Sequence, residues 1–154
     1  MGIAEVIKQK KFPNVYVKTE INLLYTAGWI ENHSNKFFKP HDISMQQYNV
    51  LRILRGQYPQ PAMLSLITER MIDRMSNATR LVEKLRLKGL LSRELNPLNR
   101  RQVDILITEE GLNLLTKIDA EFGNLVEKYK TLTEEEAELL NNLLDKMRGP
   151  GEDE

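Results

Sequence analysis

Two adjacent arginines, Arg100 and Arg101, lie between two short segments that have the sequence character of β-strands. Arginine presents a planar fork of N–H donors that matches phosphate and carboxylate oxygens, and it stays charged at physiological pH. Two such charges side by side repel each other, and a packed core gains nothing from them. We therefore expect the pair to bind an anionic partner outside the chain.

The region around these arginines is rich in positive charge. Residues 70–102 contain nine basic and three acidic residues, whereas residues 109–154 contain five basic and thirteen acidic residues. The whole chain is nevertheless neutral. This asymmetry favours different partners for the two segments, although ordinary solvated surfaces would also account for it.

Several classes of chemistry find no support in the sequence. The chain has no cysteine, and no acidic cluster accompanies its two histidines, His33 and His41, which argues against disulfides and metal sites. It has no glycine-rich phosphate loop and no evident Ser/His/Asp set, so we expect neither an enzyme nor a bound cofactor. It also has no signal peptide and no apolar run of about 20 residues, which predicts a cytoplasmic protein without a membrane partner.

The first third of the sequence predicts two helices. Residues 1–17 have mixed charge and are expected to form a loosely ordered arm. A long amphipathic helix is predicted over 18–38, where apolar residues recur every four positions. Ser44 and Gln47 have the spacing of a capping box, which predicts a second helix from there to about Tyr58.

The basic region predicts a helical pair. A short helix is expected over 62–71, and a basic helix is expected over 73–88, with Gly89 as its C-terminal stop. Met71 and Met75 lie one helical turn apart and are expected in the core.

A hairpin is predicted next, with strands over 90–95 and 102–107. A short helix, a turn and a basic helix form the helix-turn-helix pattern, whose second helix enters the major groove of DNA. The hairpin after it would be a wing, with arginines that reach the adjacent backbone or minor groove. The prediction is a mainly α (α+β) fold with a winged helix-turn-helix over 44–108, within one chain of residues 1–154.

Two more helices are predicted at the end of the chain. Thr108 and Thr133, each followed by acidic residues, are expected to open helices over 109–130 and from 134 to about Gly149, and the last four residues are expected to fray. These helices carry more apolar side chains than a small winged helix can cover: Leu112, Leu115, Ile118, Phe122, Leu125, Val126, Leu139, Leu140, Leu143 and Leu144. A homodimer is therefore predicted, with dimerisation helices over 18–38 and 109–147.

Three segments, SMQQYNVLRIL, MSNATRLVEKLRLKGLLSRE and NPLNRRQVDILITEEGLNLL, together resemble the MarR family of winged helix-turn-helix transcriptional regulators. The resemblance implies a ligand-responsive regulator, most often a repressor, that binds pseudo-palindromic double-stranded DNA as a homodimer. In that family the wing commonly reads Asp-x-Arg, and the arginine enters the minor groove, which implies this role for Arg101. Asn99 departs from the aspartate of the pattern, and residues 74–76 replace the frequent Asp-Arg-Ser start of the recognition helix.

The residues expected to contact DNA lie on the basic helix and the hairpin. They are Arg74, Ser76, Asn77, Thr79, Arg80, Lys84, Arg93, Asn99, Arg100 and Arg101. Asn77 and Thr79 are candidates for hydrogen bonds to bases or phosphates, and Arg80 and Lys84 for phosphate contacts. The alternative function is a winged-helix module that binds an acidic protein and has no specific affinity for DNA.

Four rings recur along the first long helix, at Tyr25, Trp29, His33 and Phe37. The family resemblance implies that such a stripe can line a pocket for a small aromatic effector. A core or subunit interface is the simpler interpretation, and we favour it.

Overall fold

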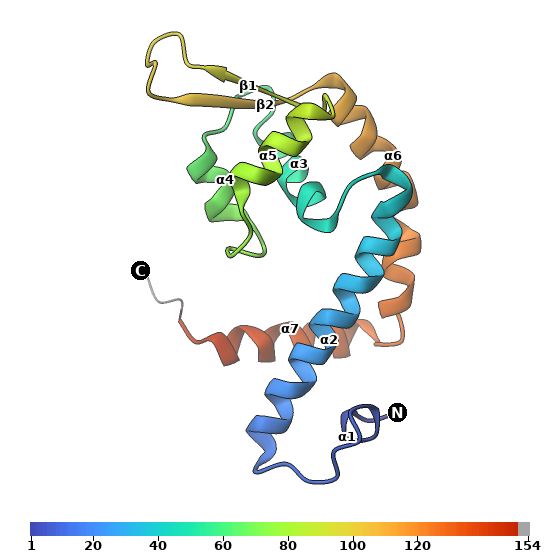
Figure 1. The fold of residues 1–154 in the computed structure, drawn as a ribbon. Coiled ribbons are helices and arrows are strands. Elements are labelled where there is room, and N and C mark those ends of the chain that lie inside the picture. The colour runs from blue at the N-terminus through green and yellow to red at the C-terminus, as the bar shows by residue number, and fades with distance from the viewer. Residues whose placement is uncertain (151–154) are drawn as a thin grey trace. The chain divides into compact units, whose positions relative to one another are not determined.

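The computed structural model describes residues 1–150 and divides into two compact units, of which the second starts at Asp119. Figure 1 shows a mainly helical chain, and a two-stranded sheet is the only sheet among the described residues. The predicted mainly α fold with a two-stranded wing is confirmed. The predicted fraying of the last four residues concerns positions outside the described part.

The first residues contain helix instead of a loose arm. Helix α1 spans Ile3–Val6, and α2 spans Val15–Phe38, so α2 begins three residues earlier than predicted. Asn14 caps α2, because its Oδ1 accepts the backbone N–H groups of Tyr16 (2.9 Å) and Val17 (3.0 Å). The predicted loose arm is therefore wrong where these helices form. The Asn14 cap explains the earlier start of α2, because it satisfies two otherwise unpaired helix donors.

A short 3₁₀ helix, η1, spans Lys39–His41 and leads to α3 at Met45–Gln57. Ser44 Oγ accepts the N–H of Gln47 (3.1 Å), and Gln47 Oε1 accepts the N–H of Ser44 (2.9 Å). The predicted capping box is confirmed.

Helix α4 spans Leu64–Arg70 and starts later than predicted. Ala62, expected in this helix, instead pairs with Ile105 of strand β2 (Val103–Ile107). The Ala62 N–H donates to Ile105 O at 2.8 Å, and the Ile105 N–H donates to Ala62 O at 2.9 Å. The backbone of Ala62 is therefore committed to the sheet and cannot begin the helix.

Helix α5 at Ala78–Leu87 and strand β1 at Leu91–Leu95 complete the winged helix. The three helices α3, α4 and α5 pack against one another and against the hairpin. Their shared core contains side chains with at most 2% exposure: Leu51, Leu54, Ile67, Val82, Leu85 and Ile105. This core fixes α5 and the wing in relation to each other.

Helix α6 (Glu109–Val126) begins directly against the hairpin. Thr108 Oγ1 donates to Gly89 O (2.7 Å) and accepts the N–H of Gly111 (3.2 Å). A Cβ atom at Gly111 would lie only 2.3 Å from Leu90 O, so this close approach requires glycine. The start of α6 is thus locked to the hairpin.

Beyond α6 the chain forms η2 at Glu127–Tyr129 and α7 at Glu134–Arg148. Helix α6 therefore ends before the predicted position, because its last turn tightens into η2. The capping box of α7 is confirmed: Thr133 Oγ1 accepts the N–H of Glu136 at 3.2 Å, and Glu136 Oε2 accepts the N–H of Thr133 at 2.9 Å. Within residues 1–150, no helix has the length and apolar content needed to cross a membrane.

Candidate nucleic-acid interface

Helix α5 owes its start to Asn77. Asn77 Oδ1 accepts the backbone N–H of Arg80 at 3.0 Å, which makes Asn77 the N-cap. Val82 and Leu85 face the core, whereas Thr79 is exposed. Arg80 and Lys84, also predicted for DNA contact, are exposed on the same helix.

The segment before α5 is a turn, and the prediction that the helix begins at residue 73 is wrong. Asp73 Oδ1 accepts the N–H of Met75 (2.9 Å), and its Oδ2 accepts the hydroxyl of Ser76 (3.1 Å). A short carboxylate that bonds its own neighbours competes with helix formation. Met75 is 93% exposed, so its predicted core position is also wrong, whereas Met71 is buried as predicted. Arg74 projects from this turn and is exposed.

The other end of the turn is anchored in the core. Buried Asn49 of α3 uses its Oδ1 to accept the N–H of Ile72 at 2.9 Å. This bond gives the buried side-chain amide of Asn49 a hydrogen-bond partner, without which its burial would be costly. Together with Asp73, it holds α4 and α5 in a fixed helix-turn-helix.

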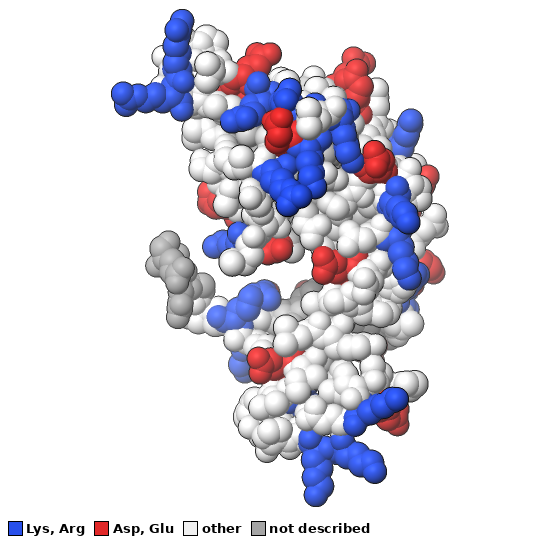
Figure 2. All heavy atoms as spheres, viewed as in Figure 1, with Lys and Arg blue, Asp and Glu red and all other residues white. Residues whose placement is uncertain are grey.

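The hairpin pairs in antiparallel register from Leu91 opposite Ile107 to Leu95 opposite Val103. At its tip, Asn99 Oδ1 accepts the N–H of Arg101 at 3.2 Å. Both arginines of the tip are exposed, and Figure 2 shows basic side chains extending from the end of the wing and over α5.

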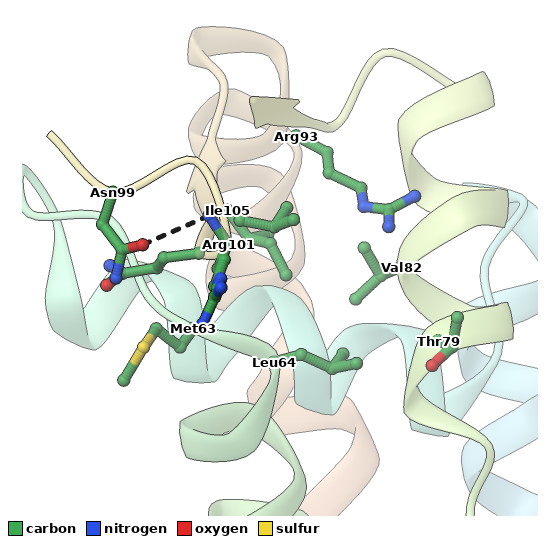
Figure 3. A pocket seen from close by; sticks show the side chains of 10 residues that line it. Met63, Leu64, Thr79, Val82, Arg93, Asn99, Arg101 and Ile105 are labelled. Carbon is green, nitrogen blue, oxygen red and sulfur yellow. Dashed lines mark hydrogen bonds between the residues drawn. The ribbon is translucent and has the colours of Figure 1, made fainter. Parts of the chain in front are cut away.

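Helix α5 and the β1–β2 hairpin border one cavity of about 380 Å³. Of the residues predicted to contact DNA, four line this cavity: Thr79 of α5 and Arg93, Asn99 and Arg101 of the hairpin. Figure 3 shows Arg93 and Arg101 directed into the space between the wing and helices α4 and α5. The remaining lining residues are Met63, Leu64, Val82, Gln102, Val103 and Ile105.

Other predicted residues lie away from this cavity. Arg74, Ser76, Asn77, Arg80 and Arg100 do not line it. Lys84 instead lines a second hollow, about 740 Å³ in volume, beside the end of α2. The structure therefore places only part of the predicted set around the space under the wing.

Met63 and Leu64 were not among the predicted site residues. They reach the cavity because the Ala62 bridge draws the start of α4 toward the sheet. No local pattern marks them, since the bridge joins residues far apart in sequence. Gln102 was missed as well, although it adjoins the predicted Arg101.

Two basic side chains at the C-terminal end of α5 interact with other groups of the chain. Lys88 Nζ donates to the backbone carbonyl of Asp42 and lies 3.5 Å from Asp42 Oδ2. Arg86 hydrogen-bonds to Glu83 on the same helix, and this bond holds the pKa of the Glu83 carboxyl below its ordinary value. These cations are thus engaged within the chain.

Two residues of the predicted effector stripe line a cavity near the N-terminus. Tyr25 and Trp29 help to line a cavity of about 260 Å³ next to α1, whereas His33 and Phe37 are not among its lining residues. The Trp29 and His33 rings meet edge to face with centroids 4.5 Å apart, and Phe37 meets Phe38 similarly at 5.1 Å.

Similarity to known proteins identifies the family of the chain. It matches no family model. It is, however, 31% identical over 119 residues to the HTH-type transcriptional regulator MhqR of Bacillus subtilis, covering 77% of this chain and 81% of that protein. The chain belongs to the MarR family of transcriptional regulators. The predicted family and the predicted class of transcription regulator are confirmed.

Solved MarR-family structures share its fold. A mutant of MarR from E. coli, complexed with operator DNA, superimposes with a TM-score of 0.78 at 22% identity and covers 92% of this chain and 100% of that one. CouR of Rhodococcus jostii, bound to p-coumaroyl-CoA, gives a TM-score of 0.72 at 22% identity, with 93% and 100% covered.

In this MarR-family chain, α4 and α5 form the helix-turn-helix and the β1–β2 hairpin forms the wing. Asn99 lies at the tip of this wing. Its amide oxygen bonds the backbone of Arg101. The wing tip therefore holds this arginine without a negative charge at position 99.

Proposed function

We propose that this protein binds double-stranded DNA at specific sites and represses transcription there. The observation that carries the proposal is the convergence of Thr79 on α5 with Arg93 and Arg101 of the hairpin around one cavity. A helix and an arginine-bearing hairpin on the same side of a protein fit a major groove and the adjoining minor groove of one duplex.

On α5 and the turn before it, Asn77 and Thr79 are proposed to contact bases or phosphates. Arg80 and Lys84 are exposed cations and are proposed to contact phosphates, which position the protein without reading sequence. Arg74 and Ser76 in the turn are further proposed contacts to the backbone.

On the wing, Arg101 is proposed to enter the minor groove, where a narrow groove concentrates negative potential. Arg100 is proposed to contact phosphate, and Arg93 the backbone near the base of the wing. Asn99 contributes by fixing the backbone of Arg101. The phosphates would relieve the repulsion between the two adjacent arginines.

Homodimerisation is proposed through the terminal helices, over 18–38 and 109–147, with the winged helix over 44–108 between them. Helix α7 has no buried residue, and Leu139 and Leu143 are 58% and 54% exposed. On α2, Leu24 is 68% exposed. A twofold partner would cover such surfaces and set two recognition helices about 34 Å apart, as a pseudo-palindromic operator requires.

Regulation by a small aromatic ligand is a further part of the proposal. It is supported by the rings of α2 and by the ligand-bound state of CouR, although a subunit interface remains the favoured role for the stripe. The relatives are transcription regulators, and we propose that this chain likewise acts in the cytoplasm and catalyses no reaction.

Selection of preferred sites from random duplexes tests the proposal, followed by affinity measurements at several salt concentrations. We expect affinity to fall steeply with salt, and Lys84→Ala to reduce the slope of log K against log salt by about one unit. Lys117→Ala on α6, outside the winged helix, serves as the matched control with an unchanged slope. No preferred duplex and no salt dependence would instead favour the protein-interaction module.

Sedimentation at micromolar concentration tests the dimer. We expect a species of about twice the monomer mass of 17.9 kDa. A monomer that still protects a complete two-half-site operator would refute the dimer.

A further inference from the structure

A single carboxylate holds both ends of the wing loop. Asp104 of β2 accepts the side-chain amide of Asn96 on Oδ2 and the side-chain amide of Gln102 on Oδ1, both at 3.0 Å. Asn96 and Gln102 flank the loop, and the Asn96 N–H donates to Gln102 O at 2.9 Å. Asp104 therefore fixes the entry and the exit of the loop together.

The same hydrogen bonds extend to the tip. Asn96 Oδ1 accepts the N–H groups of Leu98 (2.9 Å) and Asn99 (3.0 Å). Asn99 in turn bonds the N–H of Arg101 with its side chain and the N–H of Gln102 with its backbone carbonyl. A continuous chain of bonds thus connects the carboxylate of Asp104 to the backbone of Arg101.

The charge of Asp104 is unfavourable in two respects. It lies directly opposite Glu94 in the strand register, and like charges in that position destabilise a hairpin. It also places a negative charge on an element proposed to approach phosphates. Its two accepted hydrogen bonds are the compensation that the structure offers, because an ionised carboxylate is an acceptor at both oxygens.

We propose that Asp104 is a positioning residue of the wing, which holds the loop so that Arg101 is presented to the minor groove. This inference rests on the proposed DNA binding. Asp104 itself does not contact DNA, and it acts through Asn96 and Gln102. A negative charge near the DNA thereby increases affinity.

The test compares Asp104→Asn with Glu94→Gln, which removes the same charge from the opposite member of the cross-strand pair. On electrostatics alone, both variants should bind the selected duplex as well as the wild type or up to about twofold tighter. We expect this for Glu94→Gln, whereas Asp104→Asn should bind about 5–20-fold more weakly. Equal or tighter binding by Asp104→Asn would overturn the inference.

Combination with Arg101→Ala separates positioning from a general structural effect. If Asp104 acts through Arg101, then Asp104→Asn should cause no further loss of affinity in the Arg101→Ala background. Fully additive losses would overturn the inference. A wild-type protein without duplex affinity, or one indifferent to Arg101→Ala, would refute the proposed DNA binding by the wing and the inference with it.

The order of the wing loop can also be measured in the free protein, without DNA. In Asp104→Asn, backbone order parameters at Leu98, Asn99 and Arg101 should fall below about 0.6, while those of α5 stay near 0.85. An unchanged loop would overturn the inference. If Asp104→Asn does not fold, Gln102→Met removes one of the two bonds, and the same affinity and order-parameter outcomes apply to it.

Discussion

Apolar side chains are buried in the core of the winged helix and exposed on the terminal helix α7. In the winged helix, Leu51, Leu85 and Ile105 are at most 1% exposed, and the cations lie on the surface. In α7 no residue is buried, although Leu139, Leu140 and Leu143 recur along it. Both segments are amphipathic in sequence, but the leucines of α7 are exposed whereas those of the winged-helix core are buried.

The core of the winged helix is stabilised by contacts within the chain, whereas the exposed leucines of α7 are the surface that we propose a partner subunit covers. The winged helix has helices on several sides of its core, so its core side chains pack against one another. Exposed leucines at helical spacing gain free energy only when a partner removes them from water. We therefore expect the two regions to respond differently to substitution.

The largest expected effect is on α7. Replacement of both Leu139 and Leu143 by glutamine retains helix propensity but removes apolar surface. A symmetric dimer contains four of these side chains, so at about 1.5–3 kcal/mol each the dimer should lose about 6 kcal/mol or more. Sedimentation equilibrium should then show monomers, while the unfolding of the winged helix is unchanged.

The control for this change is Asn141→Gln, which lies on the other side of α7 and should leave the dimer intact. A double glutamine variant that stays dimeric would remove the contrast between the two regions.

The next effect is in the winged helix. Leu85 is fully buried, so Leu85→Ala should leave a cavity and lower the free energy of unfolding by about 2–5 kcal/mol. Leu87 is on the same helix but 71% exposed, so Leu87→Ala should change the free energy of unfolding by less than about 0.5 kcal/mol. Urea denaturation followed by circular dichroism compares the two, and equal losses would contradict the observed burial.

The wing should affect binding and not folding. Arg101→Ala should weaken binding to the selected operator by about 1–3 kcal/mol, because it removes a minor-groove contact. Arg100→Ala should mainly reduce the salt slope by about one unit. Titrations at several salt concentrations distinguish them. A double alanine variant with unaltered affinity and slope would exclude the wing from the interface.

The smallest expected effect separates two roles of Asn77. Asn77→Ala removes the cap of α5 and should cost about 0.5–2 kcal/mol of stability, whereas Asn77→Ser retains a capping oxygen. If the amide also reads a base, both variants should lower discrimination among operator variants. An intact ranking with Asn77→Ser would leave Asn77 as a cap only.

The sequence by itself determined the features that depend on neighbours a few residues apart. The capping boxes at Ser44 and Thr133 were predictable because each joins residues three positions apart. The hairpin followed from the alternation of apolar residues over 103–107 and from the turn and strand-like segment before it. The cations of α5 and the wing could likewise be identified from charge and spacing, as could the family from its three segments.

Only the tertiary structure decided how these pieces meet. The bridge from Ala62 to Ile105, and with it the place of Met63 under the wing, depends on residues more than forty positions apart. The start of α5 was misplaced because Asp73 has bonds available in a turn that helical periodicity does not reveal. Asp104 gave no signal either, since its role arises from side chains that the folded hairpin brings together. The contact between Ala62 and Ile105 in particular requires two distant segments to pack, and its free energy must offset the entropy lost in closing the chain between them.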